Sequence, residues 1–182
     1  MSELDEAWTL ALAEAEGRAR AAGRKDISDY LALRGANDLI RKIGSDWLLA
    51  MFEKLAAEAN RADAGIRIAT EDEHRFKVGT ATMVGRRLSL GRGVRVLLVE
   101  TGWPRQPRDG FIRGGGLACA NIKHLGMRSE SAALRLVLNP GGAPGWIARG
   151  GKREAGWEIH EADVRSHIAI LLDDSRVRPQ PP

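Results

Sequence analysis

The spacing of the apolar residues changes abruptly at Ala64-Gly65, and this change constrains the fold more than any other feature of the chain. Before it, apolar residues recur roughly every three to four positions, which is typical of helices packed on one side. After it, short alternating or β-branched runs are separated by only a few residues. Because a parallel crossover needs about a dozen residues or more, strands spaced this closely must pair antiparallel as hairpins.

The part of the chain before this change predicts two or three helices. Residues 3–22 carry an apolar stripe at helical spacing and form the first helix. A short helix follows from Asp26 to Gly35, because aspartate is common at a helix N-cap and glycine just after a helix end. A longer helix covers residues 37–63, and we expect it to kink or restart at Gly44.

The part after the change predicts an antiparallel β-meander of five to seven strands. The candidate strands are residues 66–70, 75–78, 81–84, 86–90, 94–99, 117–124, 132–138, 146–148 and 157–160. Residues 162–172 predict a short C-terminal helix, and a last strand over 168–172 is the alternative. The tail at 176–182 contains three prolines and is expected to be disordered.

Together these elements predict an α+β fold in which N-terminal helices cover one side of an antiparallel sheet. We expect residues 1–64 to be the helical part and 65–175 the sheet part of one compact domain. A chain of 182 residues, 43% of them hydrophobic, is long enough to bury such a core. No run approaches the roughly 18 apolar residues of a membrane span, and the N-terminus is acidic, unlike a secretory signal. We therefore expect a cytoplasmic protein.

Positive charge is concentrated in the middle of the chain. The net charge is +4, but residues 75–128 contain 11 lysines and arginines against only Glu100 and Asp109. Residues 1–74 contain 10 basic and 15 acidic residues. Such asymmetry is typical of a surface that binds a polyanion, or of a basic sheet on which acidic helices dock. The sequence leaves both interpretations open.

The segment after the predicted strand at 94–99 has a composition that suits a binding loop. Between Glu100 and Leu117 it contains two prolines, three arginines, two aromatic residues and a glycine triplet. Guanidinium groups interleaved with aromatic rings are the combination that single-stranded nucleic acids use. The candidate binding residues are Glu100, Trp103, Arg105, Arg108, Phe111, Arg113 and His124.

The same segment also has a purely structural interpretation. In it, Trp103 packs on the core and the arginines pair with Glu100, Asp109 or the acidic helices. An arginine that contacts a ligand should be exposed, whereas an arginine that anchors the loop should stabilise the fold. Glu100 ends a buried strand, where a carboxylate is either an ion-pair partner or a general base.

Motifs for catalysis or for cofactor binding are not found in this sequence. The segment Gly145–Lys152 misses the spacing of a phosphate-binding P-loop, and a strand rather than a helix follows the triplet Gly114–Gly116. Cys119 is the single cysteine, so an intrachain disulfide is impossible and we expect a buried apolar side chain. The weak candidates for a metal site are Glu158, His160, Asp163 and His167. Because nothing fixes their geometry, we predict no metal and no cofactor.

Three classes of function remain. The first is a non-catalytic module that binds a nucleic acid or another polyanion through the basic loop. The second is an interaction or regulatory domain that binds an acidic protein. The third is a small enzyme whose unrecognised site lies near Glu100 and residues 103–116, with His124 converging on the same pocket. The patterns favour binding over catalysis and leave the oligomeric state open; we expect no membrane partner.

Overall fold

The structure is a computed structural model, and it describes residues 3–150 and 153–173. These residues form three α-helices and seven strands. The helices are α1 (Glu3–Ala21), α2 (Lys25–Asn60) and α3 (Glu161–Leu172). The strands are β1 (Arg67–Val78), β2 (Ala81–Arg92), β3 (Arg95–Trp103), β4 (Ala118–His124), β5 (Ala132–Leu138), β6 (Pro144–Gly150) and β7 (Arg153–Glu158). Short 3-10 helices, η1 (Pro107–Asp109) and η2 (Arg128–Glu130), lie before β4 and β5.

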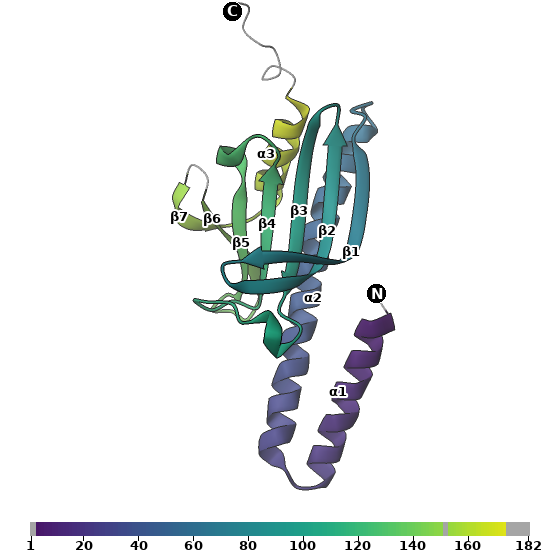
Figure 1. Cartoon of the computed structure of the whole chain (residues 1–182), viewed down its shortest axis with the longest axis vertical. Coiled ribbons are helices and arrows are strands. Elements are labelled where there is room, and N and C mark those ends of the chain that lie inside the picture. Colours follow the sequence, from purple (N-terminus) through teal and green to yellow (C-terminus); the bar gives the residue numbers. More distant parts are fainter. Residues whose placement is uncertain (1–2, 151–152, 174–182) are drawn as a thin grey trace, which may run out of the picture. The chain divides into compact units, whose positions relative to one another are not determined.

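All seven strands form one sheet in sequence order, and each neighbouring pair is antiparallel (Figure 1). The predicted α+β fold with an antiparallel meander is thus confirmed, at the upper end of the predicted strand number. The C-terminal helix is also confirmed, because residues 161–172 form α3 rather than a last strand. The tail at 176–182, which the sequence predicts to be disordered, lies outside the described residues.

The predicted helix end at Gly35 is wrong, and the helix does not restart at Gly44. Helix α2 continues from Lys25 to Asn60, so both glycines lie inside it. A glycine inside a helix costs about 1 kcal/mol relative to alanine, which packing on neighbouring elements can offset. Gly44 also has a packing role, because a Cβ there would come within 2.8 Å of the Leu136 side chain on β5.

The chain divides into two compact units after Ile43, within α2. The first unit is a helical hairpin of α1 and the beginning of α2. The second unit contains the rest of α2, the whole sheet and α3. The change of apolar pattern in the sequence lies further along, at residues 64–65, because the second half of α2 is still helical although it packs with the sheet.

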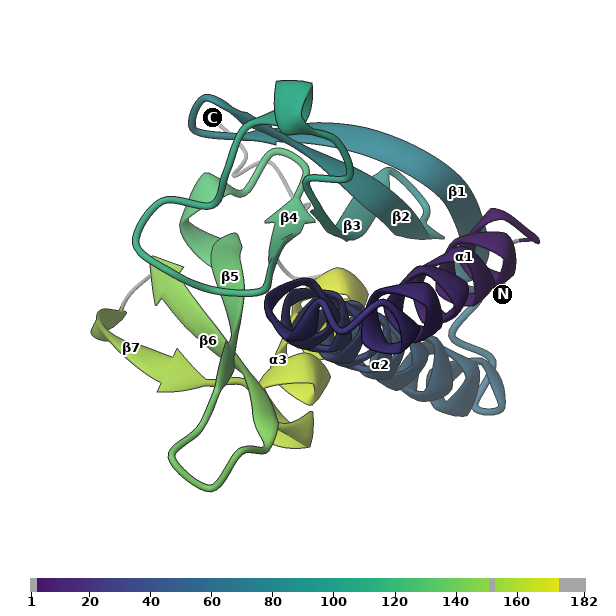
Figure 2. The same ribbon diagram turned by 90° about the horizontal axis from the view of Figure 1, so that it is seen from below.

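The core of the second unit lies between one face of the sheet and the helices α2 and α3. Figure 2 shows the sheet curving around α3, with β1, β2 and β3 on one side and β5, β6 and β7 on the other. Ser45 on α2 and Thr101 on β3 share a hydrogen bond of 3.0 Å, and Trp146 donates its indole N–H to the Gly44 carbonyl at 2.8 Å. Fully buried core residues include Leu48, Phe52, Leu88, Leu97, Ile122, Leu136 and Leu171. Among the described residues, no helix is both long and apolar enough to cross a membrane.

The β1–β2 hairpin is longer than the separate short strands that the sequence predicts. An irregularity between Glu71 and His74 lets β1 continue, and Gly85 lies inside β2 instead of between two strands. At Gly85 the two backbones come so close that a Cβ would lie 2.0 Å from the Thr101 carbonyl oxygen. Beyond this contact the hairpin bends, and its tip crosses the face of the sheet that points away from the helices (Figure 1).

The tip of this hairpin builds a second, smaller apolar cluster on that outer face. The cluster comprises Phe76, Ala81, Met83 and Cys119, with Val78 and Ile112 packed against it. Burial raises the pKa of the Cys119 thiol, and the nearby Arg135 charge only partly opposes this shift. Cys119 is therefore a buried apolar side chain, as the sequence predicts. Because Ile112 comes from the loop after β3, the cluster also anchors that loop.

Candidate functional site

The loop between β3 and β4, residues 104–117, is fixed to the sheet by its one acidic residue. Asp109 is buried, and its carboxylate accepts hydrogen bonds from the backbone N–H groups of Arg105 (3.2 Å) and Gln106 (3.0 Å). Arg75 on β1 donates a third, at 2.7 Å. Burial raises the pKa of Asp109, but the three hydrogen bonds outweigh this effect and hold the pKa below its ordinary value. The carboxylate of Asp109, the only acidic side chain of the loop, is thus fully engaged by these three donors.

Trp103 is part of the packing at the end of β3. Its side chain is only 7% exposed, and the guanidinium carbon of Arg105 lies 3.8 Å from the centre of the ring. Arg105 therefore covers an indole face that a base would need for stacking. For Trp103, the geometry agrees with the structural interpretation of the segment. Arg105 belongs to the same packed group.

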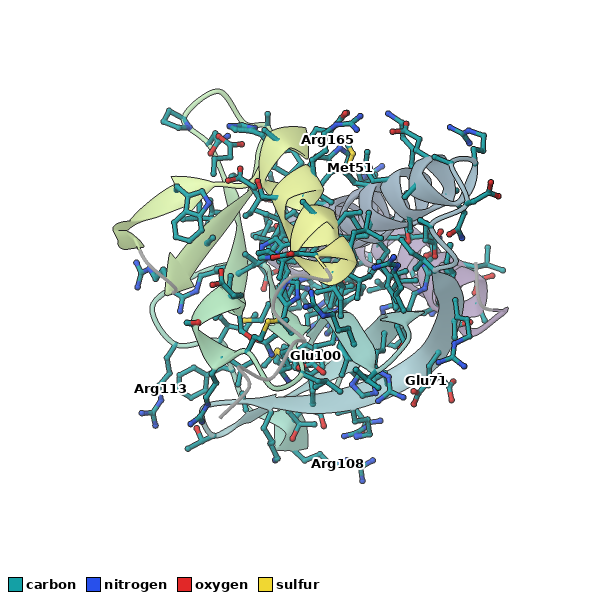
Figure 3. All side chains as sticks on the ribbon, turned by 90° about the horizontal axis from the view of Figure 1, so that it is seen from above. Met51, Glu71, Glu100, Arg108, Arg113 and Arg165 are labelled. Atoms are coloured by element: carbon teal, nitrogen blue, oxygen red, sulfur yellow. The ribbon has the colours of Figure 1, made fainter. Side chains whose placement is uncertain are left out.

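Arg108, Phe111 and Arg113 lie on the outside of the loop. All three are exposed, Phe111 to 72%, and Figure 3 shows Arg108 and Arg113 pointing outward. The turn after Arg113 requires glycine, because residues 114–116 all have positive φ, at 74°, 78° and 111°. Arg135 on β5 donates to the Gly114 carbonyl at 2.8 Å and holds this turn. We call Arg108, Phe111 and Arg113 the loop surface.

Glu100 is held by neighbours in the sheet. It lies on the outer face, because the adjacent Thr101 points toward α2. Its buried carboxylate accepts hydrogen bonds from His74 Nε2 (3.1 Å), Asn121 Nδ2 (2.8 Å) and Lys123 Nζ. Burial raises the pKa of Glu100. The three hydrogen bonds and the Lys123 charge lower the pKa by more than burial raises it, so the net shift is downward. None of these donors is a loop arginine.

Replacing Glu100 with alanine is expected to lower the free energy of unfolding by about 2–3 kcal/mol, because His74, Asn121 and Lys123 lose their common acceptor. The matched control is Glu71→Ala. Glu71 also contacts His74, at 3.5 Å, but its side chain is 47% exposed, so the loss should stay below about 1 kcal/mol. Urea unfolding of both variants makes the comparison. Equal small losses would contradict an anchoring role for Glu100.

His124 lies on the face opposite to Glu100, among the core residues. It is 3% exposed, and its Nε2 shares a hydrogen bond of 3.0 Å with Nδ1 of His167 on α3. Burial lowers the pKa of His124 to about 4; His167 and Arg95 add to the decrease, and Glu130 opposes it. The buried Nδ1 of His124 has no hydrogen-bond partner among the described residues. Protonation would therefore place an unpaired N–H in the core.

The candidate residues consequently separate instead of meeting in one pocket. Glu100 and His124 lie on opposite faces of the sheet, and the exposed arginines lie on the loop, so the convergence expected of an enzyme is not found. Sequence reasoning missed His74, Asn121 and Lys123 as partners of Glu100, and it named His167 only as a weak metal candidate. The strand register pairs Glu100 with Asn121, so Asn121 and Lys123 of β4 point to the same face of the sheet as Glu100. A shift in the register of β1 between Glu71 and His74 places His74 beside Glu100, and the sequence contains no signal for this shift.

The four residues that formed the weak metal candidate have other contacts. Glu158 accepts a hydrogen bond from Asn139 at 3.3 Å. Asp163 accepts one from the backbone N–H of His160 at 3.1 Å, at the start of α3. His167 is already paired in the core. Within residues 3–150 and 153–173, no three His, Cys, Asp or Glu side chains are grouped so that they could hold a metal ion.

Comparisons with protein-family models, with curated proteins and with solved structures give no match. The function is therefore inferred from the chemistry of this chain, above all from the charge and exposure of the loop surface.

Proposed function

We propose that the protein binds a polyanion through the loop surface, with a nucleic acid as the favoured class. One observation carries the proposal. The only acid of residues 104–117, Asp109, is buried and occupied, so the loop presents to solvent two arginines and one aromatic ring without a competing negative charge. Guanidinium groups bind phosphates through paired N–H donors, and an exposed ring offers a stacking platform for a base.

The surroundings of the loop support the proposal in two ways. Arg135 is held beside it by a hydrogen bond to the Gly114 carbonyl, which adds a positive charge at a fixed position, whereas Arg75 neutralises Asp109. The loop is also anchored by Ile112 in the outer apolar cluster. A loop that is already ordered loses less conformational entropy when it binds.

Replacing both Arg108 and Arg113 with alanine is expected to weaken binding to oligonucleotides and to reduce the slope of log K against log salt by roughly two units. The free energy of unfolding should stay within about 0.5 kcal/mol for each single change, because both side chains are exposed. Fluorescence anisotropy with single-stranded DNA and RNA over a range of salt measures the binding. Thermal melts measure the stability.

The matched control is Arg24→Ala with Arg61→Ala, which removes the same charge from two exposed positions outside the loop. If both double variants bind equally, the loop surface is not the contact, and only general charge is involved. If the unaltered protein does not bind at low salt, the proposal is wrong. The acidic protein partner and the small enzyme would then be the remaining candidates from the sequence.

Phe111 separates nucleic acids from other polyanions. Phe111→Ala should remove about 1–3 kcal/mol of affinity for a single strand if a base stacks on the ring. Its effect on heparin, which has no bases, should be near zero. An equal loss with both ligands would contradict base stacking and leave a general polyanion site.

A further inference from the structure

The first part of α2 has its polar and apolar sides reversed relative to an ordinary surface helix. Two of its charged residues point toward α1. Arg34 lies over the Trp8 ring at 5.1 Å, and Asp38 accepts hydrogen bonds from Trp8 Nε1 (3.4 Å) and from Arg41 (2.6 Å). A helix at the surface of a globular protein normally presents such residues to solvent and its apolar stripe to the neighbouring element.

The side of α2 that points away from α1 is apolar over more than three turns. Leu33, Ala36, Ile40 and Ile43 recur at the i, i+3, i+7 and i+10 spacing of a coiled-coil seam. Leu33 is 62% exposed and Ile43 is 52% exposed. At 100° per residue, the charged residues of this stretch fall on the opposite half of the helix. We call Tyr30, Leu33, Ala36, Leu39, Ile40 and Ile43 the α2 seam.

We propose that a second copy of the chain covers the α2 seam, so that the two helices pair antiparallel around a two-fold axis near Ala36. Two-fold pairing makes a surface complementary to itself. The small Ala36 side chain lets the helices approach at the crossing point. Leu33 of one copy then packs against Leu39 of the other, and Tyr30 packs against Ile43.

The acidic residues at the start of α2 favour this orientation. Asp26 and Asp29 precede Leu33 and Ala36 by seven residues, so they lie on the same side of the helix as the seam. Parallel pairing would place these like charges of the two copies against each other, which is unfavourable between adjacent helices, whereas antiparallel pairing separates them.

The exposed area of the α2 seam fits a reversible dimer. Tyr30, Leu33, Leu39 and Ile43 each expose more than half of their surface, and Ile40 is partly buried. Together they offer on the order of 500 Å² per copy, or roughly 1,000 Å² for the pair, near the lower limit for a specific interface. We therefore expect dissociation constants of about 1–100 µM rather than a permanent dimer.

Sedimentation velocity of the full chain from about 1 to about 200 µM should follow a monomer–dimer equilibrium. Leu33→Glu should raise the dimer dissociation constant by at least about tenfold, because each copy then buries a carboxylate in the contact. Leu10→Glu is the matched control, since Leu10 on α1 is equally exposed, at 63% against 62%, and lies outside the seam. A chain that stays monomeric at every concentration, or a dimer equally weakened by both changes, would overturn the proposal. Circular dichroism and a thermal melt of each variant show that the monomer remains folded.

Cross-linking tests the orientation. A variant with Tyr30→Cys and a separate variant with Ile43→Cys are treated with a short bis-maleimide, alone and mixed. Antiparallel pairing predicts cross-linked dimers chiefly in the mixture. Dimers that form as readily from each single variant alone would overturn the antiparallel arrangement. Cys119 is buried, so the unaltered protein provides the background.

Discussion

Replacing Gly85 with alanine is expected to lower the free energy of unfolding by about 3 kcal/mol or more. The added Cβ would lie 2.0 Å from the Thr101 carbonyl oxygen and 2.6 Å from the Gly102 Cα. Both contacts are with backbone, which cannot turn aside as a flexible side chain can. Either β2 separates from β3 at this point or the bend of the hairpin opens.

The matched control is Gly141→Ala, in the turn between β5 and β6. A Cβ there meets nothing within 4 Å, and the residue has no positive φ, so the change should stay within about 0.5 kcal/mol. Urea unfolding gives both values. Amide hydrogen exchange should also show faster exchange at the hairpin tip of the Gly85 variant. A Gly85→Ala protein as stable as the Gly141→Ala protein would contradict the close approach of β2 and β3.

The second large effect is a loss of folding stability at acidic pH. Between pH 7.5 and pH 5 the protein is expected to lose about 2 kcal/mol of stability through His124 alone. Its pKa is lowered from 6.5 to about 4 in the folded state. The unfolded chain therefore takes up a proton as the pH falls below 6.5, while the folded chain resists until about pH 4. Stability is complete above pH 6.5 and decreases through this window, and the lowered pKa of His167 adds in the same direction.

The carboxylates act in a different window. The pKa values of Glu100 and Asp109 are also lowered by folding, so their stabilisation is lost only as the pH falls below the ordinary values of 4.5 and 3.8. A loss between pH 6.5 and 5 thus belongs to the histidines. Urea unfolding at several pH values and an NMR titration of His124 measure it. The buried neutral pair would be contradicted if the His124 resonance titrates near pH 6.5. It would also be contradicted if the free energy of unfolding does not change between pH 7.5 and pH 5.

The antiparallel sheet and the C-terminal helix could be predicted because they follow from local chemistry. Connections such as Gly79-Thr80 and Gly93-Val94 are too short for anything but hairpins, and helical spacing favours a helix over residues 162–172. The exposure of Arg108, Phe111 and Arg113 also agrees with the composition of their loop. Short-range geometry decides these features, so the sequence contains the information.

The ends of the helices and strands were less predictable. Gly35, Gly44 and Gly85 are typical of element ends, yet each lies inside an element. At Gly44 and Gly85, side chains or backbone from elsewhere in the chain occupy the place of a Cβ. The local preference of glycine for ends is about 1 kcal/mol, and tertiary packing outweighs it.

What the sequence by itself determined is the α+β class, the antiparallel order of the strands and a basic loop that contains two aromatic residues. Only the tertiary structure decided that Glu100 and His124 face opposite sides of the sheet, that His74 reaches Glu100, and that α2 turns two of its charged residues toward α1. The physical reason is the range of the interactions. Hairpins, caps and turns depend on neighbours in the chain, whereas strand register, ion pairs and the choice of helix face depend on residues tens of positions away.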